Sequence, residues 1–265
     1  MAAASVVNAA ARVFLWAIGW LTYNRPMRRA ALAGFLCAGC GHGFFDPLPD
    51  CTAAVDAGPD ARTTSVTFEQ VNSMATTSNA GSLTVPFSTA QKAGDLVVVF
   101  VVASQTVTAV TDMSGNIYGM ALGPQSGFQQ SVYFAENIAP STPGTNSVTV
   151  GLATSAPMSV RIIEFSGLAK SNAVDNTAVM FNGASSVADS GVLTTTHAHD
   201  LLVAGDETDG ATIAPGDTYT NHLIDSDGRI VEDRVVFAPG TYNATAILNG
   251  QASWVMELVA FKADD

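Results

Sequence analysis

Hydrophobic and polar residues alternate over short stretches of residues 65–265, and turn-forming residues interrupt the pattern about every ten residues. Ser147-Val-Thr-Val-Gly-Leu152 is the clearest case, and its Val and Leu side chains fall on one face of a strand. Asp95 to Ala103 is instead almost continuously apolar, which predicts a central strand buried on both faces. The pattern predicts about fourteen short strands and an all-β fold.

One pattern occurs twice, first in residues 95–168 and again in residues 200–262. Each copy opens on an apolar strand after an aspartate, passes through a polar turn ending in tyrosine, and closes on an apolar strand that contains one acid. The matched positions are Asp95/Asp200, Tyr118/Tyr219, Val132/Val235, Pro143/Pro239 and Glu164/Glu257, with offsets of 105, 101, 103, 96 and 93 residues. The copies form either two small sandwiches or one interleaved sandwich. No Pro- or Gly-rich hinge separates them, which favours one antiparallel, jelly-roll-like β-sandwich.

The first 40 residues are typical of a secretory leader. A short basic start at Met27 is followed by about ten apolar residues and by Ala-Gly before Cys40. This segment resembles a bacterial lipoprotein signal, although Cys37 stands where that family usually has leucine. The resemblance implies lipidation of Cys40 and attachment to a membrane through the lipid.

Alternatives remain open at this end of the chain. Translation starts at Met1 or at Met27, and residues 2–23 are apolar and long enough to form a membrane helix. If cleavage falls elsewhere, Cys40 and Cys51 are spaced to close a small disulfide loop. Residues 41–64, rich in Pro, Ala, Asp and Gly, predict a flexible tether before a single β-sandwich domain at 65–265.

Charge is distributed unevenly along the chain. Four of the 11 Lys and Arg residues precede Cys40, whereas all 23 Asp and Glu residues follow it, so the part from Cys40 onward has a formal charge of −16. This balance excludes nucleic acid as a partner, because phosphate binding needs clustered Lys or Arg. It fits an exported protein, displayed on the outer membrane or cell surface or otherwise secreted.

A series of short motifs gives a second resemblance, which covers most of residues 65–263. The motifs are Asp95–Val98, Val110–Tyr118, Val132–Ala135, Glu164–Leu168, Thr195–Val203 and Trp254–Met256. Their order resembles an uncharacterised recurrent domain of bacterial secreted and surface proteins. The resemblance implies a β-sandwich, often attached to surface or carbohydrate-active proteins, and no settled activity. The fold class that we expect for the chain is a jelly-roll-like (concanavalin-like) sandwich.

Two clusters have the composition of metal sites. Asp206, Glu207 and Asp209, with Asp217 after them, supply the carboxylates that calcium prefers, and the alternative is a solvated acidic loop. His197 and His199 are two residues apart and would share a strand face, but no third ligand accompanies them.

Glu164 and Glu257 each interrupt an apolar strand. A buried carboxylate must be paired, hydrogen-bonded or protonated, because its desolvation is costly. If the repeat brings the two acids together, they form the carboxylate pair that glycoside hydrolysis needs. The alternative is a structural role, in which each acid binds an arginine, with Arg161 and Arg234 available, or backbone amides.

Aromatic residues bear on sugar binding, which requires exposed rings. Tyr118 and Tyr219 lie beside turns and are candidate ligand-binding residues, whereas Trp254 begins an apolar strand and is expected in the core. The sequence therefore favours a non-catalytic, surface-displayed binding or adhesion module, with glycans as candidate ligands. The alternatives are a glycoside hydrolase or lyase that uses paired carboxylates, and a purely structural envelope protein.

Overall fold

The computed structural model describes residues 65–125 and 127–265, which form strands and no helix and fall within one compact unit. Among these residues, no helix is long and apolar enough to cross a membrane. The predicted leader (1–40), its lipidation site at Cys40 and the predicted tether (41–64) lie outside the described residues.

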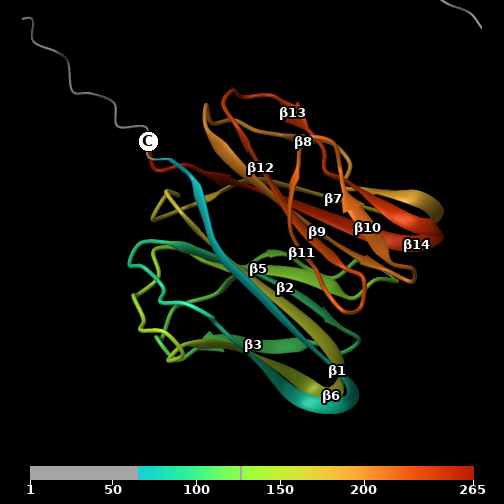
Figure 1. Ribbon diagram of the computed structural model, residues 1–265, viewed down its shortest axis with the longest axis horizontal. Helices are drawn as coiled ribbons and strands as arrows, with labels where there is room; N and C mark the ends of the chain where they lie inside the picture. The colour runs from blue at the N-terminus through green and yellow to red at the C-terminus, as the bar shows by residue number, and fades with distance from the viewer. Residues whose placement is uncertain (1–64, 126) are drawn as a thin grey trace, which may run out of the picture. The chain divides into compact units, whose positions relative to one another are not determined.

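The structure extends each copy of the repeat by the strand that precedes it, so copy one runs from β1 to β6 and copy two from β7 to β14. The first copy forms one six-stranded antiparallel sheet (Figure 1). Its strands are β1 (Thr67–Pro86), β2 (Leu96–Ala103), β3 (Val107–Asp112), β4 (Gly119–Leu122), β5 (Gln130–Ala135) and β6 (Ser147–Ser166). Their order is β1-β6-β2-β5-β4, and β3 pairs with the first part of β6. β2 is central and buried at every residue, as its apolar sequence predicts.

The second copy repeats this arrangement with its own strands. These are β7 (Val174–Asp189), β9 (Asp200–Thr208), β10 (Thr212–Pro215), β11 (Thr220–Ile224), β12 (Ile230–Val236) and β14 (Thr245–Lys262). The order β7-β14-β9-β12-β11, with β10 beside the first part of β14, matches the first sheet strand for strand. A small sheet pairs β8 (Leu193–Thr194) with β13 (Thr241–Tyr242). Within the described part of the chain, each copy thus keeps its strands in its own sheet instead of interleaving with the other.

The first and last strands of each copy are long and bent. β1 continues through a bend, because register shifts between Thr76 and Ser82 allow the strand to turn. The second half of β6 pairs with β2, whereas its first half pairs with β3. Each sheet is therefore folded over itself and encloses a hydrophobic core of its own.

Three hydrophobic cores result from this folding. The first lies inside copy one and contains alternate residues of β2 and β6, including the predicted inward face of residues 147–152. The second lies inside copy two and contains Trp254, which is 2% exposed and confirms the expected core position. The third lies between the copies, where the other faces of β2 and β9 meet through Phe100, Leu201 and Val203.

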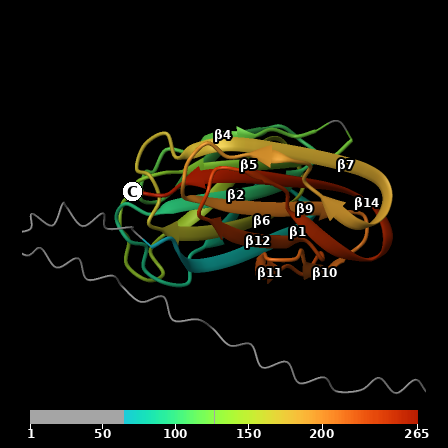
Figure 2. The same cartoon turned by 90° about the horizontal axis from the view of Figure 1, so that it is seen from above.

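The two sheets stack with approximate twofold symmetry. β1 of the first sheet contacts β11 of the second, and β7 of the second contacts β4 of the first (Figure 2). Since β1 is equivalent to β7 and β4 to β11, exchanging the copies turns one contact into the other. We call the rotation axis that relates the two copies the pseudo-twofold axis.

Strand register corrects the alignment of the two copies. Phe100 in β2 pairs with Arg161 in β6, and the equivalent Gly205 in β9 pairs with Glu257 in β14. Glu257 is therefore equivalent to Arg161, an offset of 96 residues that also relates Pro143 to Pro239. The sequence match of Glu164 with Glu257 is wrong by three residues, because similar apolar motifs occur at different registers in the two strands.

Candidate functional site

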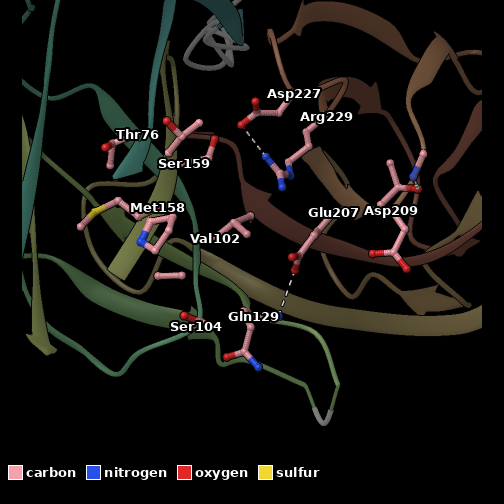
Figure 3. A pocket seen from close by; sticks show the side chains of 15 residues that line it. Thr76, Val102, Ser104, Gln129, Met158, Ser159, Glu207, Asp209, Asp227 and Arg229 are labelled. Atoms are coloured by element: carbon pink, nitrogen blue, oxygen red, sulfur yellow. Dashed lines mark hydrogen bonds and ion pairs between the residues drawn. The ribbon is translucent and has the colours of Figure 1, made fainter. Parts of the chain in front are cut away.

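A polar pocket opens where the end of β2 meets the end of β9, and its volume is about 480 Å³ (Figure 3). Val102 and Ser104 line it from the first copy, and their equivalents Glu207 and Asp209 line it from the second. Because equivalent residues meet there, the pocket lies at the pseudo-twofold axis.

The two copies line this pocket with different chemistry. Figure 3 shows Thr76, Met158 and Ser159 of the first copy facing the charged residues of the second copy across the cavity. The second copy contributes Asp227 and Arg229, whose side chains form an ion pair at 2.7 Å, in addition to the two acids already named. Hydroxyl and apolar groups therefore face carboxylates and a guanidinium.

A second pocket, of about 440 Å³, shares Glu207 and Asp209 with the first. Phe128 and Phe181 line it with their rings 6.0 Å apart and tilted by 46°, and the Phe181 side chain is 51% exposed. Asn182 and Ser253 add polar groups. We refer to the two adjoining pockets as the acidic groove; it combines an aromatic end with a polar end.

Local contacts hold the two shared acids in place. The Oε2 atom of Glu207 accepts a hydrogen bond from the backbone N–H of Gln129 at 2.9 Å (Figure 3). The backbone N–H of Asp209 donates to the carbonyl of Ser253 at 3.0 Å, and the carboxylate of Asp209 is exposed. This hydrogen bond holds the main chain that carries the carboxylate. Glu207 thus joins the two copies, since Gln129 belongs to the first.

Behind the groove, a fully buried arginine connects the two sheets. Arg161 donates to the carbonyl of Ile230 at 2.7 Å and to the side chain of Gln130, and its guanidinium lies 5.3 Å from the centre of the Phe100 ring. Burial lowers the pKa of Arg161, while the nearby acids, Asp225 first, act in the opposite direction. The residue anchors the first sheet to the second next to the groove.

Glu257 faces this arginine from the equivalent position. It is fully buried, and burial raises the pKa of its carboxyl to about 8, although Gln130 and the Arg161 charge favour the ionised form. Neither carboxyl oxygen has a well-formed hydrogen bond to the described residues. Burial therefore favours the protonated form of this side chain.

Glu164 projects from the opposite face of β6 into the first copy. Gln70 and the backbone N–H of Lys92 bind its carboxylate, and Asp95 lies beside it. Burial, and then the Glu164 charge, raise the pKa of Asp95 to about 7. Glu164 is three residues from Arg161 along β6, roughly 10 Å, and on the other face. The structure therefore does not bring Glu164 and Glu257 together.

The four acids predicted as a calcium site are spread over the second sheet. Asp206 is fully buried on the face opposite to Glu207, where the Thr212 hydroxyl and a backbone amide bind its carboxylate. Asp209 is exposed beyond β9, and Asp217 is exposed in the turn before β11. Across residues 65–125 and 127–265, no three His, Cys, Asp or Glu side chains are grouped so as to hold a metal ion. Calcium binding stays a prediction without an assembled ligand set.

The two histidines lie in a bend before β9, not on a strand. His197 is exposed, whereas His199 is buried, stacks on Phe237 at 4.8 Å and lies 3.3 Å from the carboxylate of Asp265. The two imidazoles therefore do not share a strand face.

The two candidate tyrosines lie in separate hydrophobic cores. Tyr219 is 8% exposed in the core of copy two, and Tyr118 packs against the core of copy one, where its hydroxyl donates to Asp112 at 3.1 Å. Burial raises the pKa of both hydroxyls. These placements do not form a shared platform for a ligand.

Sequence reasoning identified Glu207 and Asp209 but missed the aromatic residues beside them. Phe128 precedes β5 in the first copy and Phe181 lies in β7 of the second, so they are 53 residues apart in the chain. No local pattern relates them. The one available signal is the exposed apolar pair Met180–Phe181 in a strand whose other exposed residues are polar or small, apart from Val187.

Comparisons with protein-family models, with curated proteins and with solved structures return no match. Function must therefore be argued from the acidic groove alone.

Proposed function

We propose that the chain is an exported, surface-displayed lipoprotein whose β-sandwich is a non-catalytic binding module, and that its ligand is a glycan held in the acidic groove. The observation that supports this most directly is the contact of a polar pocket with an aromatic one across Glu207 and Asp209. This combination matches a ligand that has both hydroxyl groups and an apolar C–H face.

Each end of the groove suits one part of a sugar. Carboxylate oxygens accept strong hydrogen bonds from hydroxyl groups, and Glu207 and Asp209 place two carboxylates between the pockets. The rings of Phe128 and Phe181 offer apolar area on which the C–H face of a pyranose packs. A pocket of this size accommodates one or two sugar units.

Catalysis receives less support from the geometry. Two-carboxylate glycosidases need both acids on one substrate, at a separation of about 5–10 Å. Glu164 and Glu257 project from different faces and are bound by different residues. A jelly-roll-like, concanavalin-like topology and lipidation at Cys40 remain parts of the proposal, and mass spectrometry of the mature N-terminus tests the lipid directly.

Glycan-array screening of the full chain, followed by titration calorimetry, tests the binding site. We expect Glu207→Gln and Asp209→Asn to weaken binding of a retained glycan by about tenfold or more, because each loses a charged acceptor. Asp217→Asn is the matched control, since Asp217 is an exposed acid of the same copy outside the groove. An array without any retained glycan, or equal losses in all three variants, contradicts the proposal.

A further inference from the structure

The two sheets have unequal edges. β4 and β11, at one edge of each sheet, have 4 and 5 residues, whereas β1 and β7, at the other edges, have 20 and 16. Within the described residues, β1 pairs only with β6, and β7 only with β14. Each long edge therefore presents one row of backbone N–H and C=O groups to solvent.

Each long edge contains a seven-residue segment in unbroken register with its neighbour. These segments are residues 70–76 of β1 and residues 176–182 of β7. They are equivalent, because Met74 pairs with Val160 while Met180 pairs with Met256, the matching residue of copy two. Neither segment contains a charged residue, a proline or a glycine. Exposed strands with these properties readily add another strand.

The β7 segment is the more apolar of the two. At its centre stand Val179, Met180 and Phe181, where β1 has Ser73, Met74 and Ala75. Met180 is 47% exposed and Phe181 is 51% exposed, so the side chains at this edge are accessible on both sides of the strand. An added strand would therefore bury more apolar surface at β7 than at β1.

We propose that β7 is an interface for a second copy of this chain, which adds its own residues 176–182 as an antiparallel strand. Antiparallel pairing of a segment with itself is symmetric, so the contact closes as a dimer and leaves no growing end. The register shifts that follow Asn182 limit the pairing to this segment. The product is a continuous sheet of twelve strands, in which each of the two chains contributes the six strands of its second sheet.

Charge limits where a second chain can approach. The chain from Cys40 onward has a formal charge of −16, so most of the surface of one copy repels another. The β7 segment itself carries no charge, and the acids of the groove, Glu207 and Asp209, lie at its Phe181–Asn182 end. A contact of seven residue pairs is small, so the dimer is expected to be weak and concentration-dependent. Phe181 and Asn182 of this segment also line the acidic groove, so the dimer changes the aromatic end of the groove, but the pairing itself requires no ligand there.

The duplicated fold provides a matched test. The mass of the full chain, measured by sedimentation equilibrium between about 1 and about 100 µM, is expected to rise toward twice the monomer mass. Met180→Lys places a charge on the β7 edge and is expected to keep the chain monomeric, whereas Met74→Lys, at the equivalent position of β1, is expected to leave the dimer intact. Both side chains are about half exposed, so both variants are expected to fold.

Hydrogen exchange provides a second measurement. Backbone amides of residues 176–182 are expected to gain protection as the concentration rises, while those of residues 70–76 do not change. A monomer at every concentration overturns the proposal. Loss of the dimer in Met74→Lys but not in Met180→Lys, or equal loss in both, also overturns it.

Discussion

The two copies of the repeat share one strand order but differ at the positions where they meet. Their strand pairing is alike, and Met74 and Met180 occupy equivalent register positions on the two edge strands. Near the axis, Phe100 of copy one is equivalent to Gly205 of copy two, and a Cβ atom on Gly205 would lie 2.7 Å from the Phe100 ring. The large side chain of Phe100 in copy one therefore requires a glycine at the equivalent position of copy two.

Charge follows the same rule as volume. Arg161 and Glu257 are equivalent, fully buried and oppositely charged when ionised. Two arginines or two glutamates at these positions would place like charges in a sealed interior, at a cost of several kcal/mol. At the pseudo-twofold axis, equivalent residues of the two copies lie close to each other. They cannot both be large or carry the same charge, so a duplicated sandwich loses its symmetry there first. The acidic groove at this axis has the same asymmetry.

The largest expected effect is a difference in stability between substitutions of Arg161 and of Glu257. Arg161→Leu should lower the free energy of unfolding by about 3–5 kcal/mol, because the Ile230 carbonyl and the Gln130 side chain lose their donor in a dry interior. Glu257→Leu should cost about 1 kcal/mol or less, because its carboxyl has no well-formed hydrogen bond to lose. Urea unfolding of the two variants measures both values. Equal costs would contradict the asymmetry.

The next effect is a loss of stability as the pH rises. Burial is the main cause that raises the pKa of Glu257 to about 8, from an ordinary 4.5, and Glu232 is raised similarly to about 8. The folded state thus holds these protons more tightly than the unfolded chain. Their contribution is fully present below pH 4.5 and is lost as the pH rises through about 8.

Unfolding free energies at pH 5 and pH 8 test this expectation. The wild-type chain should be less stable at pH 8, and Glu257→Gln should remove about 3 kcal/mol of the difference, because the amide mimics the protonated acid. Asp217→Asn, in an exposed turn, serves as the control and should leave the pH profile unchanged. A profile that rises from pH 5 to pH 8 would show that these carboxyls ionise without cost.

A smaller effect tests the fit of volume at the axis. Gly205→Ala should cost about 1–3 kcal/mol, because its methyl group would overlap the Phe100 ring. Phe100→Leu in the same chain should restore part of that loss, so the double-mutant cycle should show a favourable coupling energy. Gly183→Ala is a suitable control, since nothing lies within 4 Å of a Cβ atom there. Strict additivity would mean that the two residues do not contact.

Local pattern was sufficient for the features that depend on neighbours in the chain. The apolar run of β2, the alternating residues 147–152 and the core position of Trp254 all follow from adjacent residues. Strand register does not, because a shift of a few residues preserves the apolar pattern. For this reason the match of Glu164 with Glu257 was wrong.

The groove was only half predictable for a related reason. Glu207 and Asp209 stand out as neighbouring acids in the chain, but Phe128 and Phe181 come from different copies and meet only through the stacking of the sheets. Burial also decided what the remaining acids do. Asp206 follows the same local pattern as Glu207, yet it faces a closed core.

The smallest effect on stability is expected at Asp209, where the copies differ within the groove that we propose as a binding site. Asp209→Ser installs the kind of side chain that Ser104 supplies at the equivalent position, and Asp209 is exposed, so the unfolding free energy should change by less than about 0.5 kcal/mol. Binding of an array-selected glycan should nevertheless fall by about tenfold, because the groove loses one of the two acids shared by its pockets. Calorimetry and urea unfolding on the same preparation separate the two readouts. Unchanged binding would mean that the divergence at Ser104 and Asp209 serves no ligand, whereas a large stability loss would assign Asp209 a structural role at the axis.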